Sequence, residues 1–540
     1  MIKKLFRGQI ESITTAAFLV ALSSLVSRFL GILRDRILAG EFGAGKTLDI
    51  YYAAFRLPDL IFNLLVLGAL SAGFIPVFTK LIKNSAAPRD NPEAWRLANN
   101  IISILGLFLV ALTAIAIFFS KPLMSVFAPG FSGDELAATV KLTRIMFLSP
   151  ILLGLSGVFG GILQSFKRFF VFSLAPIFYN VGIIIGALYF VPWLGVKGLA
   201  WGVVVGALFH LLIQIPATSR LGFSFRPSFA FRDAGVRQIG RLMIPRTFSL
   251  AIAQIDLSVS TAIATTLVSG SLAIFNFANN LQSFPIGIFG ISFATAVFPA
   301  LSANAGDKKR FIENFSLAFR QIMFFIIPAT VLLLILRAQI IRVVLGSGQF
   351  NWEDTVLTLK TLGFFSLSLF AQAGIPLLAR MFYARENSLK PFLIGLISVA
   401  LDIGLSLWLS KSLGVVGLAL AFSIANIVNF FLLWIFLRFD LGGMDEVKIF
   451  KSVAKFSLAA ILAGLAAQFT KTSIAEWVDM TRFLGILIQG FSAGLAGLAV
   501  YFITCYILRS EELYGFWSGF KRRLPWAKID TGDHTEARGI

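Results

Sequence analysis

The chain is poor in the residues that build disulfides, metal sites and water-facing surfaces. Its 540 residues include one cysteine and two histidines, and only 14% are charged. The single cysteine excludes a disulfide framework within the chain, and the scarcity of both residue types argues against a zinc centre. Soluble domains carry about 25% charged residues. The shortage of charge therefore indicates that much of the surface does not face water.

Long apolar runs take the place of the missing charge. Hydrophobic residues make up 57% of the chain, and stretches of about 20 apolar residues, enough to cross a bilayer, recur throughout. Runs of this length predict helices, because a barrel would show short alternating segments. We therefore expect an all-α polytopic membrane protein with about fourteen spans. They are predicted near 12–33, 50–78, 97–119, 139–163, 170–192, 196–217, 241–268, 273–301, 314–336, 355–383, 390–410, 413–437, 451–470 and 482–508.

The excess of basic residues is explained by their positions in the loops between the predicted spans. The net charge is +20, and the lysines and arginines gather in every second loop between the predicted spans. Basic residues concentrate on the cytoplasmic side of membrane proteins, so this pattern predicts that both termini are cytoplasmic. Because the charge lies between membrane helices, it does not predict binding of nucleic acid.

The sequence repeats itself at long range. LGVKGLA at 194–200 recurs as LGVVGLA at 413–419, and each copy opens the sixth span of a block of six. An even number of spans per block gives both blocks the same orientation, and such parallel repeats place the substrate between the halves. The predicted domains are an N-lobe at 1–219, a C-lobe at 220–440, two further helices at 441–508 and a basic cytoplasmic tail at 509–540.

Two prolines mark the second span of each lobe. They are Pro58 and Pro76 in the first lobe, and Pro285 and Pro299 in the second. Proline removes a helical hydrogen bond and bends the helix. We therefore expect hinges at these four positions.

The string GEFGAGKT at 40–47 matches the phosphate-binding pattern G-x-x-x-x-G-K-[ST]. That motif binds a nucleotide only where a strand enters it and a helix leaves it in an α/β domain. Here the preceding residues continue a membrane helix, and the predicted topology places the loop outside, where there is no ATP. We interpret the string as a Gly-rich turn and expect no ATP binding. Lys46 is then at most a residue of an outer gate.

Ionisable residues on the first span predict a cationic cavity. A charge within the bilayer costs about 2.5–3.5 kcal/mol on insertion scales and marks a functional candidate. Arg28 lies on this span, and Arg34 and Asp35 lie at its outer end. Six residues turn a helix by about 600°, so the arginines lie about 120° apart and flank one cavity. Guanidinium groups bind phosphate bidentately and stay charged when desolvated, which favours an anionic solute or a phosphorylated lipid headgroup. The alternative is that Arg34 and Asp35 only reach toward headgroups at the interface.

The second span carries another polar group. Arg56 and Asp59 share a helix face at i, i+3 on either side of a proline, and Asn63 lies one turn further along. They are candidates for the same cavity. A neutralised structural pair is the alternative.

Two carboxylates lie within predicted spans of the second half. Asp256 is on the seventh span, and Asp402 is on the eleventh with Ser398 on the same face. An unpaired carboxylate inside a membrane needs a proton, a cation or an arginine. Arg246 opens the seventh span and is either a cavity residue or a positive-inside anchor. His210, among apolar residues, is expected to be a packed interfacial side chain.

Two long blocks resemble the MurJ (MviN) family of lipid II flippases. They are SRFLGILRDRILAGEFGAGKTLDIYYAAFRLPDLIFNLLVLGALSAGFIPVF at 27–78 and QIDLSVSTAIATTLVSGSLAIFNFANNLQSFPIGIFGISFATAVFPALS at 254–302. The resemblance implies the multidrug/oligosaccharidyl-lipid/polysaccharide exporter fold. In that fold, two six-helix lobes form a V, and two extra helices form a groove for a lipid tail.

The resemblance also assigns residues to a site. Positions that the family uses in its central cavity and outer gate correspond to Arg28, Arg34, Asp35 and Asp49. Family members often carry charged residues at four positions that are here Phe62, Asn63, Leu67 and Asn280. Arg56 and Arg246 are expected to supply the missing positive charge. Some members bind sodium with acidic residues on spans 7 and 11, and Asp256 and Asp402, with Ser398 beside them, resemble that site.

The resemblance implies a flippase, not an enzyme. It would carry lipid II, the undecaprenyl-pyrophosphate-linked peptidoglycan precursor, across the bacterial inner membrane by alternating access. It would need no cofactor beyond a gradient of Na⁺ or H⁺ or the membrane potential. Two alternatives stay open at this point: an exporter of another polyprenyl-linked glycan or small molecule in the same fold, and a non-transporting scaffold for cell-wall synthesis enzymes.

Overall fold

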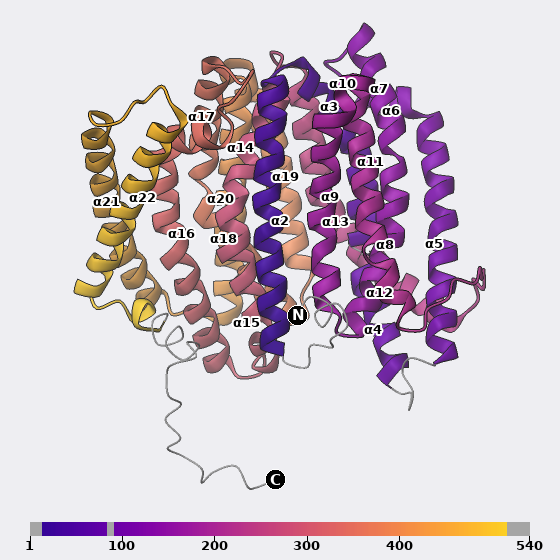
Figure 1. Cartoon of the computed structure of the whole chain (residues 1–540). Coiled ribbons are helices and arrows are strands. Elements are labelled where there is room, and N and C mark those ends of the chain that lie inside the picture. Colours follow the sequence, from indigo (N-terminus) through magenta and orange to yellow (C-terminus); the bar gives the residue numbers. More distant parts are fainter. Residues whose placement is uncertain (1–12, 68, 84–90, 516–540) are drawn as a thin grey trace. The chain divides into compact units, whose positions relative to one another are not determined.

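The computed structural model describes residues 13–67, 69–83 and 91–515. Within these ranges the chain forms helices joined by turns and by one longer loop at 220–233, and no strand occurs there (Figure 1). The all-α fold predicted from the apolar runs is confirmed. Of the predicted tail, residues 516–540 lie outside the described part.

The helices follow one another in chain order. The first half contains α2 (Ile13–Phe42), α3 (Lys46–Phe62), η1 (Asn63–Leu67), α4 (Ala69–Lys83), α5 (Pro92–Phe118), α6 (Ser120–Phe127), α7 (Gly133–Met146), α8 (Leu148–Ser165), α9 (Phe169–Ile185), η3 (Gly186–Phe190), α10 (Val191–Leu194), α11 (Lys197–Leu212) and α12 (Ile215–Ser219). The second half contains α13 (Ala234–Thr265), α14 (Ser271–Pro285), η4 (Ile286–Ile291), α15 (Ser292–Ala303), α16 (Lys308–Val344), α17 (Trp352–Ser366), α18 (Leu369–Ala384), α19 (Leu389–Leu413), α20 (Val415–Leu441), α21 (Glu446–Ala475) and α22 (Phe483–Ile507).

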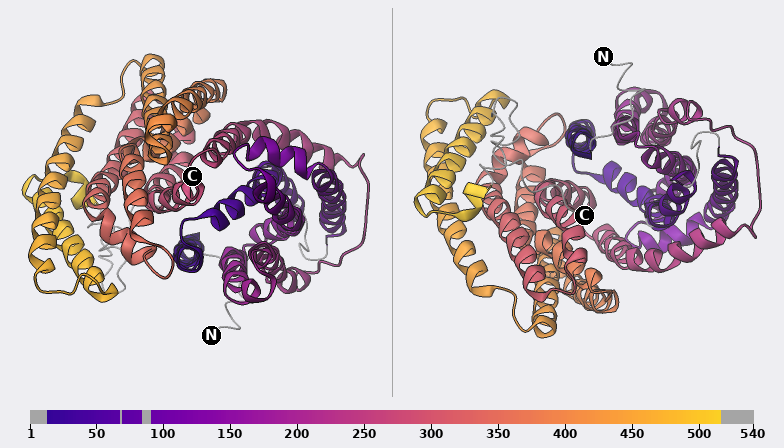
Figure 2. Two further views of the ribbon diagram at one scale, coloured as in Figure 1. Left: turned by 90° about the horizontal axis from the view of Figure 1, so that it is seen from above. Right: turned by 90° about the horizontal axis from the view of Figure 1, so that it is seen from below.

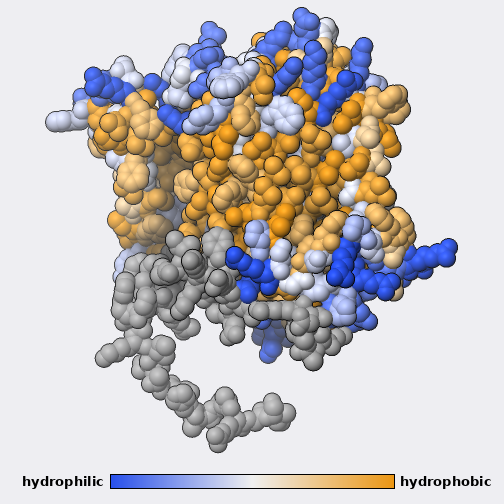
Figure 3. All heavy atoms as spheres, turned by 45° about the vertical axis from the view of Figure 1, so that its right-hand side comes forward, coloured by the Kyte–Doolittle hydropathy of each residue, from blue (hydrophilic) through white to orange (hydrophobic). Residues whose placement is uncertain are grey.

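Among the described residues, ten helices are long and apolar enough to cross a membrane, and the bent pair α17 and α18 makes an eleventh. α2, α13 and the α3–α4 segment complete the pattern of about fourteen but do not pass that test. The count of fourteen therefore stays a prediction. Figure 3 shows the expected distribution on one face, with apolar side chains along the middle of the helices and charged ones at their ends.

The described chain divides into two compact units. The first comprises residues 1–284, 341–365 and 392–428, and the second comprises 285–340, 366–391 and 429–540. The first unit thus joins the N-terminal helices to α13, α19 and most of α14. The lobe boundaries drawn from the sequence repeat stay a prediction.

Within the first unit, α2 packs against α9, and α13 packs against α4. The coils of this unit, indigo to magenta, are seen nearly end-on in Figure 2. Small residues allow close packing, since a Cβ on Gly182 would lie 2.2 Å from the backbone of Gly206. Helices α9 and α11 therefore touch through their main chains.

The two copies of the sequence repeat adopt the same turn. Gly195 and Gly414 have φ of +59° and +58°, values that favour glycine. A Cβ on Gly198 or on Gly417 would lie 2.5 Å from the backbone that precedes the turn. The repeat therefore records one local structure used twice.

Irregular helix also recurs in both halves. Pro58 lies in α3 just before the π-helical segment η1, and Pro285 ends α14 just before the π-helical segment η4. Pro76 and Pro299 lie inside α4 and α15. π-Helical turns mark breaks in the regular hydrogen-bond ladder and frequently lie at functional sites. The hinge role of the four prolines stays a prediction that this geometry favours.

Candidate functional site

Arg34 is the centre of a buried polar cluster on α2. Its Nε and Nη2 donate to Asp35 Oδ1 at 3.0 and 2.8 Å, and its Nη1 donates to Asn180 Oδ1 at 3.2 Å. Asn280 Nδ2 on α14 donates to the other oxygen of Asp35 at 2.9 Å. The side chains of Arg34 and Asp35 are 22% and 7% exposed. The cluster therefore ties α2, α9 and α14 together, and these two residues do not behave as interfacial side chains that reach for headgroups.

Aromatic residues surround this cluster. The rings of Tyr51 and Tyr52 meet edge to face at 5.3 Å, and Tyr52 also contacts Phe277 of α14 at 6.0 Å. The Tyr52 hydroxyl is buried without a hydrogen-bond partner among the described residues. A buried phenol of this kind is a donor available to a ligand.

Asn180, Tyr51 and Tyr52 were not among the residues predicted from the sequence. Asn180 stands alone as a polar residue in the apolar run FYNVGIII, which is a readable signal for a functional position in a membrane helix. The tyrosines give no such signal, because their type is common at membrane interfaces.

Arg28 lies nearer the start of α2 and is half-buried. Within the described residues it makes no side-chain hydrogen bond and no ion pair, in contrast to Arg34. Arg28 is therefore a guanidinium that can accept an anion without first losing a protein partner. Arg246 belongs to α13, but its side chain lies outside the described part of the chain.

Arg56 of α3 belongs to a second, separate cluster. Its Nη2 donates to the carbonyl and side-chain oxygens of Gln254 at 3.0 and 2.9 Å, and its Nε donates to Ser258 Oγ at 3.2 Å. Asp59 lies 3.5 Å away, and Asn63 Nδ2 donates to the Asp59 carbonyl oxygen at 2.9 Å. In this conformation the donors of Arg56 are used to hold α3 against α13. This arrangement matches the structural alternative better than an open phosphate site.

Asp49 closes one end of the first unit. Its two carboxylate oxygens accept hydrogen bonds from the backbone N–H groups of Gly270 and Ala273 at 2.6 and 2.8 Å. The first N–H groups of a helix have no partner within the helix, so Asp49 of α3 caps α14 from another element. Lys46, one turn earlier, forms an exposed ion pair with Glu135 of α7 at 2.8 Å. Both predicted gate residues therefore lie at this end.

The string GEFGAGKT also lies at this closed end. α2 continues to Phe42, about two turns beyond Arg34, so Gly40 is helical and the turn comprises only Gly43 to Gly45. The helix thus continues past the apolar span predicted near 12–33, as expected from the residues that precede Gly40. Gln349 N–H donates to the Gly40 carbonyl oxygen at 2.8 Å. The residues of this string thus end a helix and form a turn, and Gly40 contacts the turn that contains Gln349. A turn was expected from the membrane context.

A second carboxylate supports this contact. Asp354 of α17 accepts a hydrogen bond from the Ala44 N–H at 3.1 Å. Gly348 has φ +56°, and a Cβ there would lie 2.1 Å from the Gly40 carbonyl oxygen. Asp49 and Asp354 thus each hold main-chain N–H groups of a distant turn.

Asp256 and Asp402 face each other from α13 and α19. Their carboxyl groups interact directly, and Asp256 Oδ1 is buried without a donor among the described residues. Ser406 Oγ donates to Asp402 Oδ1 at 3.4 Å, whereas Ser398 Oγ donates to the carbonyl oxygen of Ala425 at 2.9 Å. Two carboxylates in contact repel each other unless a proton or a cation lies between them.

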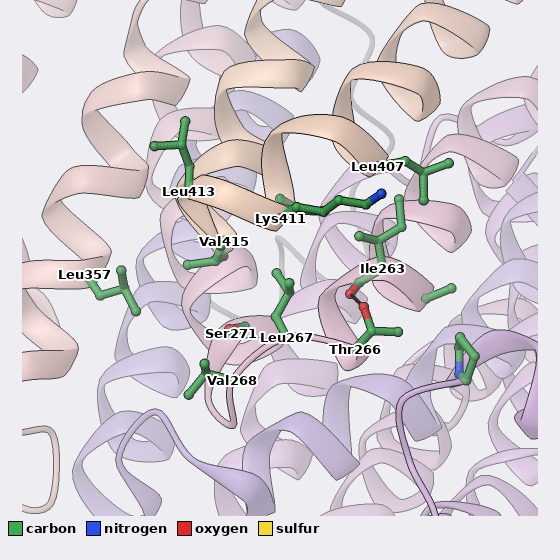
Figure 4. Close-up of a pocket in the computed structure, with 14 residues that line it drawn as sticks. Ile263, Thr266, Leu267, Val268, Ser271, Leu357, Leu407, Lys411, Leu413 and Val415 are labelled. Atoms are coloured by element: carbon green, nitrogen blue, oxygen red, sulfur yellow. Dashed lines mark hydrogen bonds between the residues drawn. The ribbon is translucent and has the colours of Figure 1, made fainter.

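The aspartate pair lies on a polar stripe. The buried residues of α19 recur at every fourth position and are Ile394, Ser398, Asp402, Ser406 and Ser410. A spacing of four keeps these residues on one face of the helix. The last of them, Ser410, lines a cavity of about 770 Å³ together with Thr266 and Lys411. Figure 4 shows the Lys411 side chain extended between Leu407 and Ile263. The stripe therefore leads from the aspartate pair to a cavity.

His210 does not contribute to either cluster. Its Nδ1 lies 2.7 Å from Ser156 Oγ, which also accepts a hydrogen bond from Gln214 Nε2 at 2.6 Å. The histidine is thus hydrogen-bonded within a packed helix interface.

Known proteins share this sequence over most of its length. The family model of the lipid II flippase MurJ matches residues 38–488. A probable lipid II flippase MurJ of Vibrio cholerae is 30% identical over 90% of this chain and 94% of its own length. One from Buchnera aphidicola of Acyrthosiphon pisum is 30% identical over 77% of this chain and 81% of its own length.

Solved structures agree. A lipid II flippase MurJ in an inward closed conformation matches with a TM-score of 0.75 at 25% identity, covering 91% of this chain and 98% of that one. An inward-facing multidrug exporter of the MATE family shares the fold alone, with a TM-score of 0.63 at 18% identity over 78% of this chain and 96% of that one. These matches do not favour a drug exporter or a scaffold. The chain belongs to the MurJ family of lipid II flippases.

Proposed function

We propose that this chain moves lipid II, a polyprenyl pyrophosphate that carries a disaccharide-peptide, from the inner to the outer leaflet of the bacterial plasma membrane. The substrate changes side without any change in its covalent bonds. The observation that carries the proposal is the buried Arg34–Asp35–Asn180–Asn280 cluster beside an unpaired Arg28, within a chain of this family.

Arg28 is the residue that first binds the pyrophosphate. Its guanidinium has no protein partner among the described residues, and a fork of donors matches two phosphate oxygens. Arg34 is engaged with Asp35 and Asn180 in this conformation. It becomes available when the cluster opens, and the anion then moves from one arginine toward the other along α2.

The closed end is the outer gate. The basic loops favour cytoplasmic termini, an orientation in which the turn between α2 and α3 faces outward. Opening requires Asp49 to release Gly270 and Ala273, and Asp354 to release Ala44. All three donors are backbone N–H groups, and water can bind them in the open state. The gate can therefore open without leaving a buried N–H group that has no hydrogen-bond partner.

A monovalent cation couples the cycle at Asp256 and Asp402. Asp256 Oδ1 has no hydrogen-bond partner among the described residues and lies by the carboxyl group of Asp402. These oxygens suit such an ion, because Na⁺ takes carboxylate and carbonyl oxygens as ligands. Ser398 stands on the same face of α19, with its oxygen free to accept. A bound cation or proton would remove the repulsion between the two carboxylates and so favour the packing of α13 on α19.

The substrate assignment is tested with the protein reconstituted in liposomes that contain lipid II. Arg28→Ala is expected to slow flipping at least tenfold, because one charge-assisted contact contributes about 1.5–3 kcal/mol. Arg28→Lys keeps the charge and is expected to lose less. Arg232→Ala, at an exposed loop position, is the matched control. Full activity of both Arg28→Ala and Arg34→Ala would reject the cavity assignment.

The coupling proposal has its own measurement. Flipping by the unaltered protein is expected to rise with a Na⁺ or H⁺ gradient, and Asp256→Asn and Asp402→Asn are expected to remove that dependence. Asp134→Asn, at an exposed helix start, is the control. A gradient dependence that survives both substitutions would place the coupling site elsewhere.

A further inference from the structure

A basic pocket lies at one end of α21 and α22 in the second unit, outside the site described above. Its volume is about 360 Å³. The start of α21 contributes three lysines, and the chain that follows α22 contributes an arginine and two glutamates. The charged residues that line it are Lys448, Lys451, Lys455, Arg509, Glu511 and Glu512.

The carboxylates of this pocket already have partners. Glu512 is buried and forms an ion pair with Arg320 of α16, and it accepts hydrogen bonds from Ser452 Oγ at 2.9 Å and Ser510 Oγ at 2.7 Å. Glu511 lies 3.3 Å from Lys448 Nζ, and the hydrogen bond from that ammonium holds the pKa of Glu511 below its usual range. Both glutamates are therefore already paired with a cation.

Three cations remain without a counter-charge. The side chains of Lys451, Lys455 and Arg509 make no ion pair or hydrogen bond among the described residues, although all three line the same pocket. Lys448, Lys451 and Lys455 stand at i, i+3 and i+7, which is one face of a helix. A ligand with negative charge would complete this arrangement.

The pocket adjoins an exposed apolar surface of α21. Beside and beyond the lysines, α21 exposes large apolar side chains. They are Phe450, 74% exposed, Leu458, 50%, Ile461, 57%, and Leu465, 63%. A span of this hydropathy carries such side chains toward lipid. The charged head of a ligand would thus sit at the pocket while its apolar part lies along α21.

We propose that this pocket binds the phosphate headgroup of an anionic phospholipid of the bilayer, with its acyl chains against α21. Basic pockets at the ends of membrane helices suit such headgroups, and each lysine or arginine near an anionic surface contributes about 1 kcal/mol, or about fivefold in affinity. The headgroup pocket uses none of the residues assigned to the pyrophosphate of lipid II, although α21 is one of the two helices that the resemblance assigns to a lipid-tail groove.

The test is native mass spectrometry of the full chain with phosphatidylglycerol or phosphatidylethanolamine at equal concentration. The protein is expected to retain phosphatidylglycerol preferentially. Lys451→Gln/Lys455→Gln/Arg509→Gln is expected to weaken that binding on the order of 100-fold. The three single variants, each about fivefold weaker, decide the question if the triple variant does not fold.

A matched control removes the same charge elsewhere. Lys308→Gln/Lys309→Gln/Arg310→Gln, at the exposed start of α16, is expected to bind within about twofold of the unaltered protein, since those residues line no described pocket. Equal loss in both triple variants, equal retention of the two lipids, or displacement by glycerol phosphate at the concentration of the lipid would overturn the proposal. So would stronger competition by a polyprenyl pyrophosphate than by phosphatidylglycerol, which would make the pocket a substrate site.

Discussion

Replacement of Asp49 by alanine removes the side chain that caps α14 from α3. Two hydrogen bonds are lost, to the backbone N–H groups of Gly270 and Ala273 at 2.6 and 2.8 Å. Both N–H groups are at the start of a helix, where no intrahelical acceptor exists. In the closed end they are then buried without a partner, whereas in an open end water binds them.

The size of the effect follows from those two bonds. A hydrogen bond to a charged group contributes about 1.5–3 kcal/mol, so the closed state loses at least about 3 kcal/mol relative to the open state. That difference changes the ratio of closed to open molecules by on the order of 100-fold. Asp49→Asn keeps one acceptor oxygen and is expected to give about half the free-energy change.

Pulsed electron paramagnetic resonance measures the ratio. Spin labels are placed at Glu41 and Val268, which are exposed at the closed end, after the buried Cys505 has been changed to serine. The unaltered protein should give one short distance, and Asp49→Ala should add a longer population that dominates.

The control is Asp134→Ala, which removes an aspartate from the exposed start of α7. It should leave the distance distribution as it was. An unchanged distribution for Asp49→Ala would refute the reasoning, because the two backbone bonds would then contribute nothing to closure. A shift of the same size in both variants would point to general loss of charge instead.

Two further substitutions test the packing. Gly270→Ala is expected to lower the melting temperature in detergent, since φ there is +92° and a Cβ would lie 2.0 Å from the Ala44 carbonyl oxygen; Gly133→Ala, with φ +51° but no atom within 4 Å, should cost only about 1–2 kcal/mol of backbone strain. An equal effect of the two alanines would contradict the close contact. Arg320→Ala leaves Glu512 buried without a counter-charge and should destabilise the fold by about 3–5 kcal/mol, read as a lower melting temperature. Arg320→Met combined with Glu512→Leu should recover most of that loss, and a double variant as unstable as the single one would show that the ion pair itself is needed.

The spans could be predicted from the sequence because a bilayer demands long apolar helices. The same criterion says less about where a helix ends. The apolar span predicted at the start of the chain stops near residue 33, because Arg34 and Asp35 follow it. The helix α2 that contains this span continues to Phe42. Charge within a span signals a site but conceals the end of the helix.

Partnerships across the chain could not be read from the sequence. Arg56 and Asp59 were paired correctly from their i, i+3 spacing, a local rule. Arg34 instead bonds to Asn180, 146 residues away, and Ala44 bonds to Asp354, 310 residues away. Such pairs depend on how helices pack, and a single sequence holds no spacing rule for them.

The cap on α14 has a consequence for evolution. Asp49 binds main-chain N–H groups, and every residue except proline supplies one. The residue at position 273 can therefore change between species without altering its bond, whereas Gly270 is fixed by its φ of +92° rather than by Asp49, and Asp49 stays fixed. The two sides of the gate would then show no correlated substitutions. A screen for suppressors of an Asp49 variant should accordingly find no compensating side chain on the α13–α14 turn, and instead recover changes that favour closure elsewhere.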